Sequence, residues 1–270
     1  ISIRQNCRTM NVNKPLTLLG GISPAEFMNT YWQRKPLLVR QAIPEFKALL
    51  SRSELFDLAE HNEVESRLVM GTNGGQRDWQ MQRGPFKRRA IPKLTERDWT
   101  LLVQGVDLHD DRVADLMQQF RFVPDARLDD VMISYATDGG GVGPHFDSYD
   151  VFLLQAHGQR RWRIGRQKDL SLVPDMPLKI LANFKPEYDW VLNPGDMLYL
   201  PPRYAHDGVA QGECMTYSVG FRVPQMGDLA RELLVRLSEG ADETAGCDLY
   251  KDADQPAVSK PAAMPEGLVD

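Results

Sequence analysis

The sequence predicts a mainly β protein whose core is a double-stranded β-helix of the jelly-roll kind, preceded by a mixed α/β flank. From Val131 to Val223, short apolar runs alternate with turns rich in Gly, Pro and Asn, and no long helical period interrupts them. Before this stretch, two helix-start signals flank one short apolar run. We therefore expect a flank over residues 1–125, a β-helix core over residues 126–225, and a helix with a linker over residues 226–270.

The flank begins with two capped helices and a strand between them. Ser23-Pro24-Ala25-Glu26 combines an N-cap, a Pro at the first helical position and a Glu three residues after the cap, so it predicts a helix that buries Phe27. Ser51 and Glu54 repeat the capping signal for a second helix. Between the two helices, the apolar residues of segment 35–39 predict a strand.

Helical apolar spacing recurs three more times. Segments 95–106 and 111–120 both show it, which predicts two further helices in the flank. After the core, Leu229, Leu233 and Leu237 fall on one stripe of a helix. From residue 240 onward the sequence is polar and rich in Pro, as expected for a linker.

Two segments of the core have clear local signals. Segment 151–164 predicts two strands around the turn at Gly158, with basic residues alternating against Trp162 and Ile164. Segment 193–206 predicts a tight turn at its Pro-Gly pair, a short apolar strand, and a stop at its Pro-Pro pair. The second pattern delivers His206 at a strand end.

The most informative motif is His145-Phe146-Asp147, which follows the Gly-rich turn 139–144. Alternate residues of a strand point the same way, so His145 and Asp147 share one face. Together with His206 they form a set of two imidazoles and one carboxylate, which leaves the opposite face of a metal open and is typical of non-haem Fe(II) oxygenases. A lone His-x-Asp pair is also common as a surface hydrogen-bonded pair, so the interpretation depends on the flanking turns and on His206.

Arg160 is a candidate to bind a co-substrate beside this metal site. It lies about fifteen residues beyond His145, in a strand that we expect near the metal. The planar guanidinium binds carboxylates with two parallel hydrogen bonds. Arg160 is therefore a candidate to hold the distal carboxylate of a 2-oxo diacid whose oxo-acid end chelates the iron; the alternative is a solvated base beside its basic neighbours.

Ordered blocks over Trp79 to Val223 resemble the JmjC-type 2-oxoglutarate oxygenases, and specifically the bacterial ribosomal oxygenases that hydroxylate an arginine of large-subunit ribosomal protein L-sixteen. This series is far more specific than the three candidate metal ligands alone. The blocks are Gly84-Pro85-Phe86, Trp99-Thr100-Leu101-Leu102-Val103-Gln104, Gly139 to His145, Tyr149-Asp150-Val151-Phe152, Arg160-Arg161-Trp162-Arg163 and Tyr217-Ser218-Val219-Gly220-Phe221-Arg222.

The resemblance implies a JmjC-like, cupin-type double-stranded β-helix and an enzyme that uses Fe(II), with 2-oxoglutarate and dioxygen as co-substrates. It implies that His145, Asp147 and His206 are the iron ligands and that Ser134 and Arg160 hold 2-oxoglutarate. The implied substrate is an arginine side chain of ribosomal protein L-sixteen.

The family resembled continues into a helical dimerisation region and a small C-terminal domain, whereas this sequence stops at Asp270. We expect this chain to lack those parts, so the homodimer that the resemblance implies for the family is not extended to it. At the other end, Met10 is a candidate natural start.

An arginine substrate needs carboxylates or aromatic faces at the mouth of the pocket. Asp138, Tyr149 and Asp150 lie close in sequence to the candidate metal ligands and are our candidates for this role. The alternative reading, polar residues of turns and strand edges, fits their positions equally well.

Composition restricts the class of protein. A net charge of −5 argues against a general nucleic-acid binder and suits a basic protein partner. Cys7, Cys214 and Cys247 are too widely spaced for a zinc knuckle and odd in number, which indicates a reducing compartment such as the cytoplasm. No apolar run approaches the length of a membrane span, so no membrane partner is expected.

Three classes of function therefore remain open. The first is a hydroxylase of a ribosomal protein arginine. The second is an oxygenase with the same iron site acting on another protein side chain, either as a hydroxylase or as a lysine demethylase. The third is a metal-binding cupin that is not an oxygenase, and Arg160 argues against it because such a protein has no need of that residue.

Overall fold

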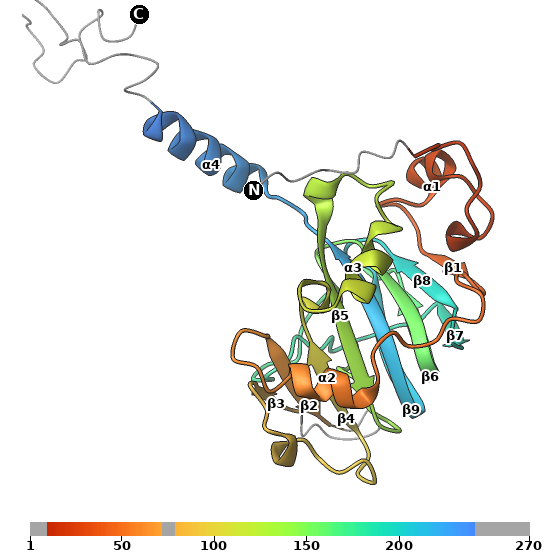
Figure 1. Cartoon of the computed structure of the whole chain (residues 1–270), viewed down its shortest axis with the longest axis vertical. Coiled ribbons are helices and arrows are strands. Elements are labelled where there is room, and N and C mark those ends of the chain that lie inside the picture. The colour runs from red at the N-terminus through yellow and green to blue at the C-terminus, as the bar shows by residue number, and fades with distance from the viewer. Residues whose placement is uncertain (1–9, 72–78, 241–270) are drawn as a thin grey trace, which may run out of the picture. The chain divides into compact units, whose positions relative to one another are not determined.

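The computed structural model describes residues 10–71 and 79–240 (Figure 1). The chain divides into two compact units, residues 1–223 and residues 224–270. The first unit is built around a nine-stranded sheet in which every described pair of strands is antiparallel, with few helices. The predicted mainly β fold is thus confirmed, whereas the boundaries predicted between flank, core and linker stay predictions.

The strands follow the order β1-β8-β6-β9-β5-β4-β2-β3 across the sheet, and β7 pairs with β6. The two longest, β6 and β9, pair along almost their whole length and hold the rest of the sheet together. The strands are β1 (Leu37–Val39), β2 (Ser66–Met70), β3 (Gln80–Arg83), β4 (Trp99–Val103), β5 (Leu128–Ala136), β6 (Val151–Gly165), β7 (Tyr188–Leu192), β8 (Met197–Leu200) and β9 (Ala205–Phe221).

The helices of the flank begin where the capping signals predict. The Ser51 hydroxyl accepts a hydrogen bond from the Glu54 amide (3.3 Å), and the Glu54 carboxylate accepts one from the Ser51 amide (2.6 Å), which completes a capping box. Ser23 likewise caps the first helix. The α-helices are α1 (Pro24–Thr30), α2 (Arg52–Leu58), α3 (Asp111–Gln118) and α4 (Met226–Glu239), and the 3-10 helices are η1 (Thr17–Leu19), η2 (Arg88–Ala90), η3 (Val106–Leu108) and η4 (Asp125–Arg127).

One predicted helix is wrong. Segment 95–106 contains the strand β4, which pairs with β2 on one side and β5 on the other. All five residues of β4 are buried, so its apolar run fits a strand covered on both faces as well as a helix. Pairing with two neighbours decides between them. The strands β2 and β3, which pair with each other, were not foreseen.

The turn predicted at Gly158 is also wrong, because β6 runs through it as a single strand. The residues from Gln155 to Gln159 form a bulge with a shifted register against β9. The side-chain Nε2 of Gln155 donates to the carbonyls of His157 (2.8 Å) and Gly158 (3.3 Å), which stabilises the bulge. Gly158 has φ +60°, and a Cβ there would lie 2.0 Å from the Glu213 carbonyl oxygen, so only glycine lets the strand bend without breaking.

The flank packs onto the β core through aromatic rings and one buried polar cluster. Phe27 of α1 contacts Phe152 of β6 and Tyr199 of β8, with ring centroids 5.5 and 5.0 Å apart. The Tyr199 hydroxyl donates to the buried Asp150 carboxylate (2.6 Å), and the Gln33 side chain donates to the same group (2.9 Å). These contacts fix the segment just before β6, which carries two of the three candidate metal ligands, His145 and Asp147.

The second unit contains α4, as the leucine stripe predicts. Leu229, Leu233 and Leu237 are between 50 and 60% exposed, so the stripe has no apolar cover among the residues described. The linker predicted after residue 240 lies outside the described part of the chain. Among the described helices, none has the length and apolar character needed to cross a membrane.

We expect Tyr199→Phe to lower the free energy of unfolding by about 2 kcal/mol, because it removes a hydrogen bond to the buried carboxylate of Asp150. Urea denaturation measures the change. Tyr188→Phe on β7 is the matched control, since Tyr188 is 46% exposed and should be neutral. Equal stability of Tyr199→Phe and the control would show that the buried cluster does not hold the flank to the core.

Candidate metal centre

A single β-bridge brings the two histidines together. The amide of His145 donates to the carbonyl of His206 (2.9 Å), and the amide of His206 donates to the carbonyl of His145 (2.8 Å). Their ring centroids are consequently 4.2 Å apart. The carbonyl of Asp147 accepts from the amide of Arg203 (2.7 Å), which ties the other end of the motif to the turn between β8 and β9.

Both imidazoles are oriented by the main chain. His145 Nδ1 lies 2.9 Å from the Gly143 carbonyl oxygen, and His206 Nδ1 lies 2.9 Å from the Tyr204 carbonyl oxygen. A carbonyl only accepts hydrogen bonds, so each Nδ1 carries the proton and each Nε2 keeps its lone pair. This is how metal-binding histidines are held in proteins. One ligand atom from each of His145, Asp147 and His206 lies within 4.8 Å of the others, as a shared ion requires.

The surroundings of His206 favour its uncharged form, which can bind a cation. Burial and the neighbouring His145 together lower the pKa of His206 to about 4, although Asp147 acts in the opposite direction. At neutral pH the ring is therefore uncharged, which is the form that binds metals. The Asp147 carboxylate lies 3.6 Å from His206 Nε2 and supplies the anionic ligand of the set.

The candidate metal ligands face a cavity of about 600 Å³. Ser134 of β5 and Arg160 of β6 line the same cavity, so the structure brings together all five residues that the sequence assigned to metal and co-substrate. The remaining lining residues are Arg67, Met81, Arg83, Leu102, Gln104, Asp129, Asp130, Met132, Val142, Phe146, Tyr149, Val151, Leu153, Trp162, Pro177, Leu178, Lys179, Thr216, Ser218 and Gly220.

Arg160 is the most unusual charge in the cavity. Its side chain is almost fully buried, and its Nε and Nη2 atoms have no hydrogen-bond partner among the described residues. A buried cation without a partner is costly, so the site is suited to an anion entering from the cavity. The guanidinium carbon lies 5.8 Å from the centre of the Trp162 ring. The donor set thus fits a carboxylate.

Ser134 is placed to assist. It is buried on β5, and its hydroxyl donates to the Thr216 carbonyl of the paired strand β9 (3.3 Å). The hydroxyl oxygen still has acceptor capacity, and the proton can rotate toward a ligand in the cavity instead. The role assigned to Ser134 from the sequence therefore stays a prediction that its position permits.

Of the three substrate candidates, only Tyr149 lines the cavity. Burial and the nearby Asp147 carboxylate raise the pKa of the Tyr149 phenol. Asp138 pairs instead with Arg97 (2.7 Å), and Asp150 is the buried anchor bound by Tyr199. Both aspartates serve the local structure, so we do not propose them as substrate contacts.

Sequence reasoning overlooked Asp130 and Met132 as cavity residues. They share a face of β5 with Ser134, because they lie four and two residues before it on the same strand. The period of two was therefore a usable signal. Asp130 accepts a hydrogen bond from the Gly105 amide (2.9 Å), and burial raises the pKa of its carboxyl.

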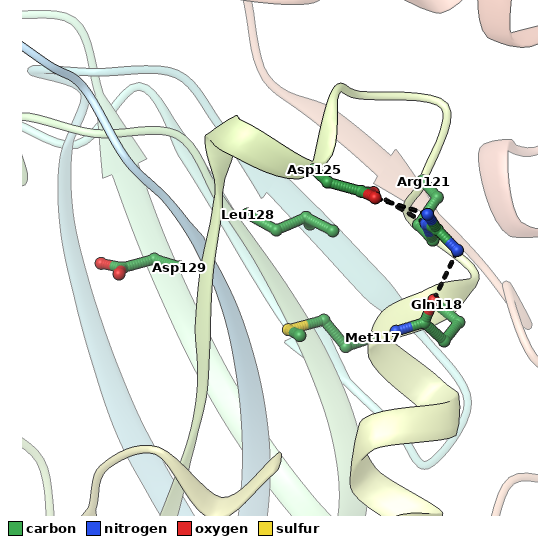
Figure 2. Close-up of a pocket in the computed structure, with 6 residues that line it drawn as sticks. All are labelled: Met117, Gln118, Arg121, Asp125, Leu128 and Asp129. Atoms are coloured by element: carbon green, nitrogen blue, oxygen red, sulfur yellow. Dashed lines mark hydrogen bonds and ion pairs between the residues drawn. The ribbon is translucent and has the colours of Figure 1, made fainter. Parts of the chain in front are cut away.

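A second, smaller hollow of about 320 Å³ lies where α3 and η4 meet β5 (Figure 2). Arg121 there donates to Asp125 (2.7 Å) and to Gln118 (3.1 Å), so its charge is already engaged. The hollow is also lined by Met117, Leu128 and Asp129, with no histidine or cysteine. Its lining therefore offers no group of metal ligands comparable with that of the larger cavity.

Comparison with known proteins agrees with this geometry. Residues 115–229 match the JmjC domain family. The chain is 40% identical over 239 residues to the ribosomal protein uL16 3-hydroxylase of Escherichia coli K12, covering 88% of this chain and 62% of that protein. It is 38% identical to a probable ribosomal oxygenase of Haemophilus influenzae, covering 77% of this chain and 52% of that one.

Among solved structures, the E. coli ribosomal oxygenase YcfD in complex with cobalt and 2-oxoglutarate matches with a TM-score of 0.72 at 38% identity. The match covers 91% of this chain and 63% of that chain. This chain therefore spans less than two thirds of the length of these relatives. The likeness confirms the jelly-roll fold.

We expect His145→Ala to weaken divalent metal binding by at least about a hundredfold, because it removes a ligand and not merely a group that supports one. Calorimetric titration of Mn(II) or Zn(II) into chelator-treated protein measures the loss. His157→Ala is the matched control, since His157 is exposed on β6 and does not line the cavity. Equal metal affinity in both variants would remove His145 from the site.

Stability of the metal-free protein should fall as the pH drops from about 6.5 toward about 4. In this window the unfolded chain protonates His206 while the folded chain keeps it neutral, so protons favour unfolding. Urea denaturation at a series of pH values, in wild type and in His206→Gln, isolates the effect. The same pH slope in both proteins would contradict the low pKa of His206.

Proposed function

The chain contains a JmjC domain, and from this premise we propose that it is an Fe(II)- and 2-oxoglutarate-dependent protein hydroxylase. One observation carries the proposal. A single cavity holds two histidines whose Nδ1 atoms are engaged by the main chain, a carboxylate beside them, and the buried guanidinium of Arg160, two of whose nitrogen atoms have no partner among the described residues. A metal and an anionic co-substrate would complete both halves of this arrangement.

His145, Asp147 and His206 would hold the iron, and Arg160 with Ser134 would hold the distal carboxylate of 2-oxoglutarate. Bound iron would supply the oxidative chemistry with dioxygen, in which one oxygen atom enters 2-oxoglutarate as it loses carbon dioxide to become succinate, and the other enters a substrate C–H bond. The protein contributes orientation. The main-chain acceptors fix the tautomers of both rings, so that each Nε2 is free to bind the metal.

The substrate that we propose is an arginine side chain of ribosomal protein uL16. The support is the name of the E. coli relative and the character of the cavity. Asp130 offers a carboxylate to a guanidinium, Tyr149 offers an aromatic face, and Met132 lies between Asp130 and Ser134 on the same strand. A long cationic side chain with an apolar stem suits such a lining.

Two finer expectations from the sequence remain predictions. A cytoplasmic location would place the enzyme where ribosomal proteins are made. The net charge of −5 suits a basic protein substrate better than a nucleic acid.

Incubation of uL16 fragments with this chain, Fe(II) and 2-oxoglutarate should add one oxygen atom to an arginine, detected by tandem mass spectrometry. Omission of 2-oxoglutarate is the control. Succinate release without modification of uL16 would keep the oxygenase and reject this substrate. Absence of both products would favour a metal-binding cupin that is not an oxygenase.

Arg160→Ala should raise the 2-oxoglutarate concentration needed for half-maximal succinate formation by at least about tenfold, because it removes a charge-assisted, two-point contact. Arg161→Ala is the matched control. Arg161 points away from the cavity on the same strand, is exposed, and pairs with Asp189. An unchanged dependence on 2-oxoglutarate in Arg160→Ala would remove Arg160 from the co-substrate site.

A further inference from the structure

Trp162 has a buried hydrogen-bond donor that no described residue accepts from. It lies on β6 two residues after Arg160, so both side chains face the cavity. The residue is 5% exposed, and its indole Nε1 has no acceptor within the part of the chain that the structure describes. A buried indole N–H usually finds a partner, because leaving it unmade costs about 1–3 kcal/mol.

The position of the indole is tightly fixed. Its six-membered ring packs on the main chain of Gly208 in β9, where a Cβ would lie only 2.6 Å from the ring carbons Cη2 and Cζ3. The ring centroid lies 5.9 Å from that of His206 and 5.8 Å from the guanidinium carbon of Arg160. Trp162 therefore lies close both to a candidate metal ligand, His206, and to the candidate anion-binding residue, Arg160.

The donor atoms of Arg160 and Trp162 that have no acceptor among the described residues could all bind one carboxylate. Arg160 contributes Nε and Nη2, and Trp162 contributes Nε1, so three buried donor nitrogen atoms lack an acceptor among the described residues. A carboxylate has about four lone-pair sites, of which a two-point arginine contact uses two. A further donor can therefore bind the same carboxylate without competing with Arg160.

We propose that Trp162 is a further co-substrate-binding residue, whose indole N–H donates to the carboxylate of 2-oxoglutarate that Arg160 holds. The inference rests on the proposed function, since it assigns a new contact within that site. It also gives Gly208 a role, because a side chain there would push the indole out of position. The contact favours a diacid over a 2-oxo acid that ends in a methyl group.

Calorimetric titration of 2-oxoglutarate into zinc-substituted protein tests the contact without turnover. Trp162→Phe keeps an aromatic ring and removes the N–H, and we expect the Kd for 2-oxoglutarate to rise about tenfold. Trp190→Phe is the matched control. Trp190 of β7 is paired with Trp162 of β6 but does not line the cavity. The control should stay within about twofold of wild type.

A comparison ligand identifies the carboxylate. 2-Oxopentanoate has the same chain as 2-oxoglutarate but a methyl group in place of the distal carboxylate. Trp162→Phe should leave its affinity unchanged. Equal weakening of both ligands would assign the N–H to the oxo-acid end and overturn the proposal, as would an unchanged Kd for 2-oxoglutarate.

Wild-type protein gives an independent measurement that does not depend on how Trp162→Phe folds. The chain has five tryptophans, and the ¹⁵N–¹H indole signal of Trp162 can be assigned by elimination with single Phe replacements of the others. We expect this signal to move downfield when 2-oxoglutarate is added to the zinc-substituted protein and to stay in place with 2-oxopentanoate. A signal that 2-oxoglutarate leaves unmoved would contradict the contact.

Two different results separate a failure of the proposed function from a failure of the role assigned to Trp162. If wild-type protein does not bind 2-oxoglutarate at all, the proposed function is wrong and the role of Trp162 falls with it. If wild type binds 2-oxoglutarate, and neither the Trp162 variant nor the indole signal responds, only the assignment of Trp162 is overturned.

Discussion

The site depends on the pair of main-chain hydrogen bonds that joins His145 to His206. This bridge links the Gly-rich turn before β6 to the first residues of β9, segments about sixty residues apart in the sequence. It sets the two rings side by side, and carbonyls two residues before each histidine then orient them. The metal chemistry therefore rests on backbone geometry, and the long pairing of β6 with β9 holds that geometry in place.

Burial of charge distinguishes the site from the scaffold. Asp150 is fully buried, yet Tyr199 and Gln33 satisfy it, so it needs no ligand and serves to dock the flank on the core. Arg160 is buried as deeply but lacks partners for two of its nitrogen atoms among the described residues. A buried charged side chain whose hydrogen bonds the fold supplies, such as Asp150, serves the structure. One whose hydrogen bonds the fold leaves unmade, such as Arg160, is suited to bind a ligand.

Much of this could be predicted from the sequence, and the failures have physical causes. Turn residues and caps act locally, so α1, α2, β8 and the position of His206 follow from a few neighbours each. The strand β4 could not be told from a helix, because its five buried residues are defined by pairing with β2 and β5. Asp130 and Trp162 were overlooked as site residues although strand alternation from Ser134 and Arg160 points to both. Asp138 and Asp150 were suggested by closeness in sequence, which does not determine the direction of a side chain.

The central claim is that one cavity binds a metal and a dicarboxylate together, so that bound metal strengthens the binding of the dicarboxylate. The most direct test is the affinity of 2-oxoglutarate measured by calorimetry on the same preparation, first freed of metal and then loaded with Zn(II). We expect binding to be far tighter with metal present, because chelation at the three metal ligands and the contact with Arg160 act on one molecule. An affinity that metal leaves unchanged would contradict the account.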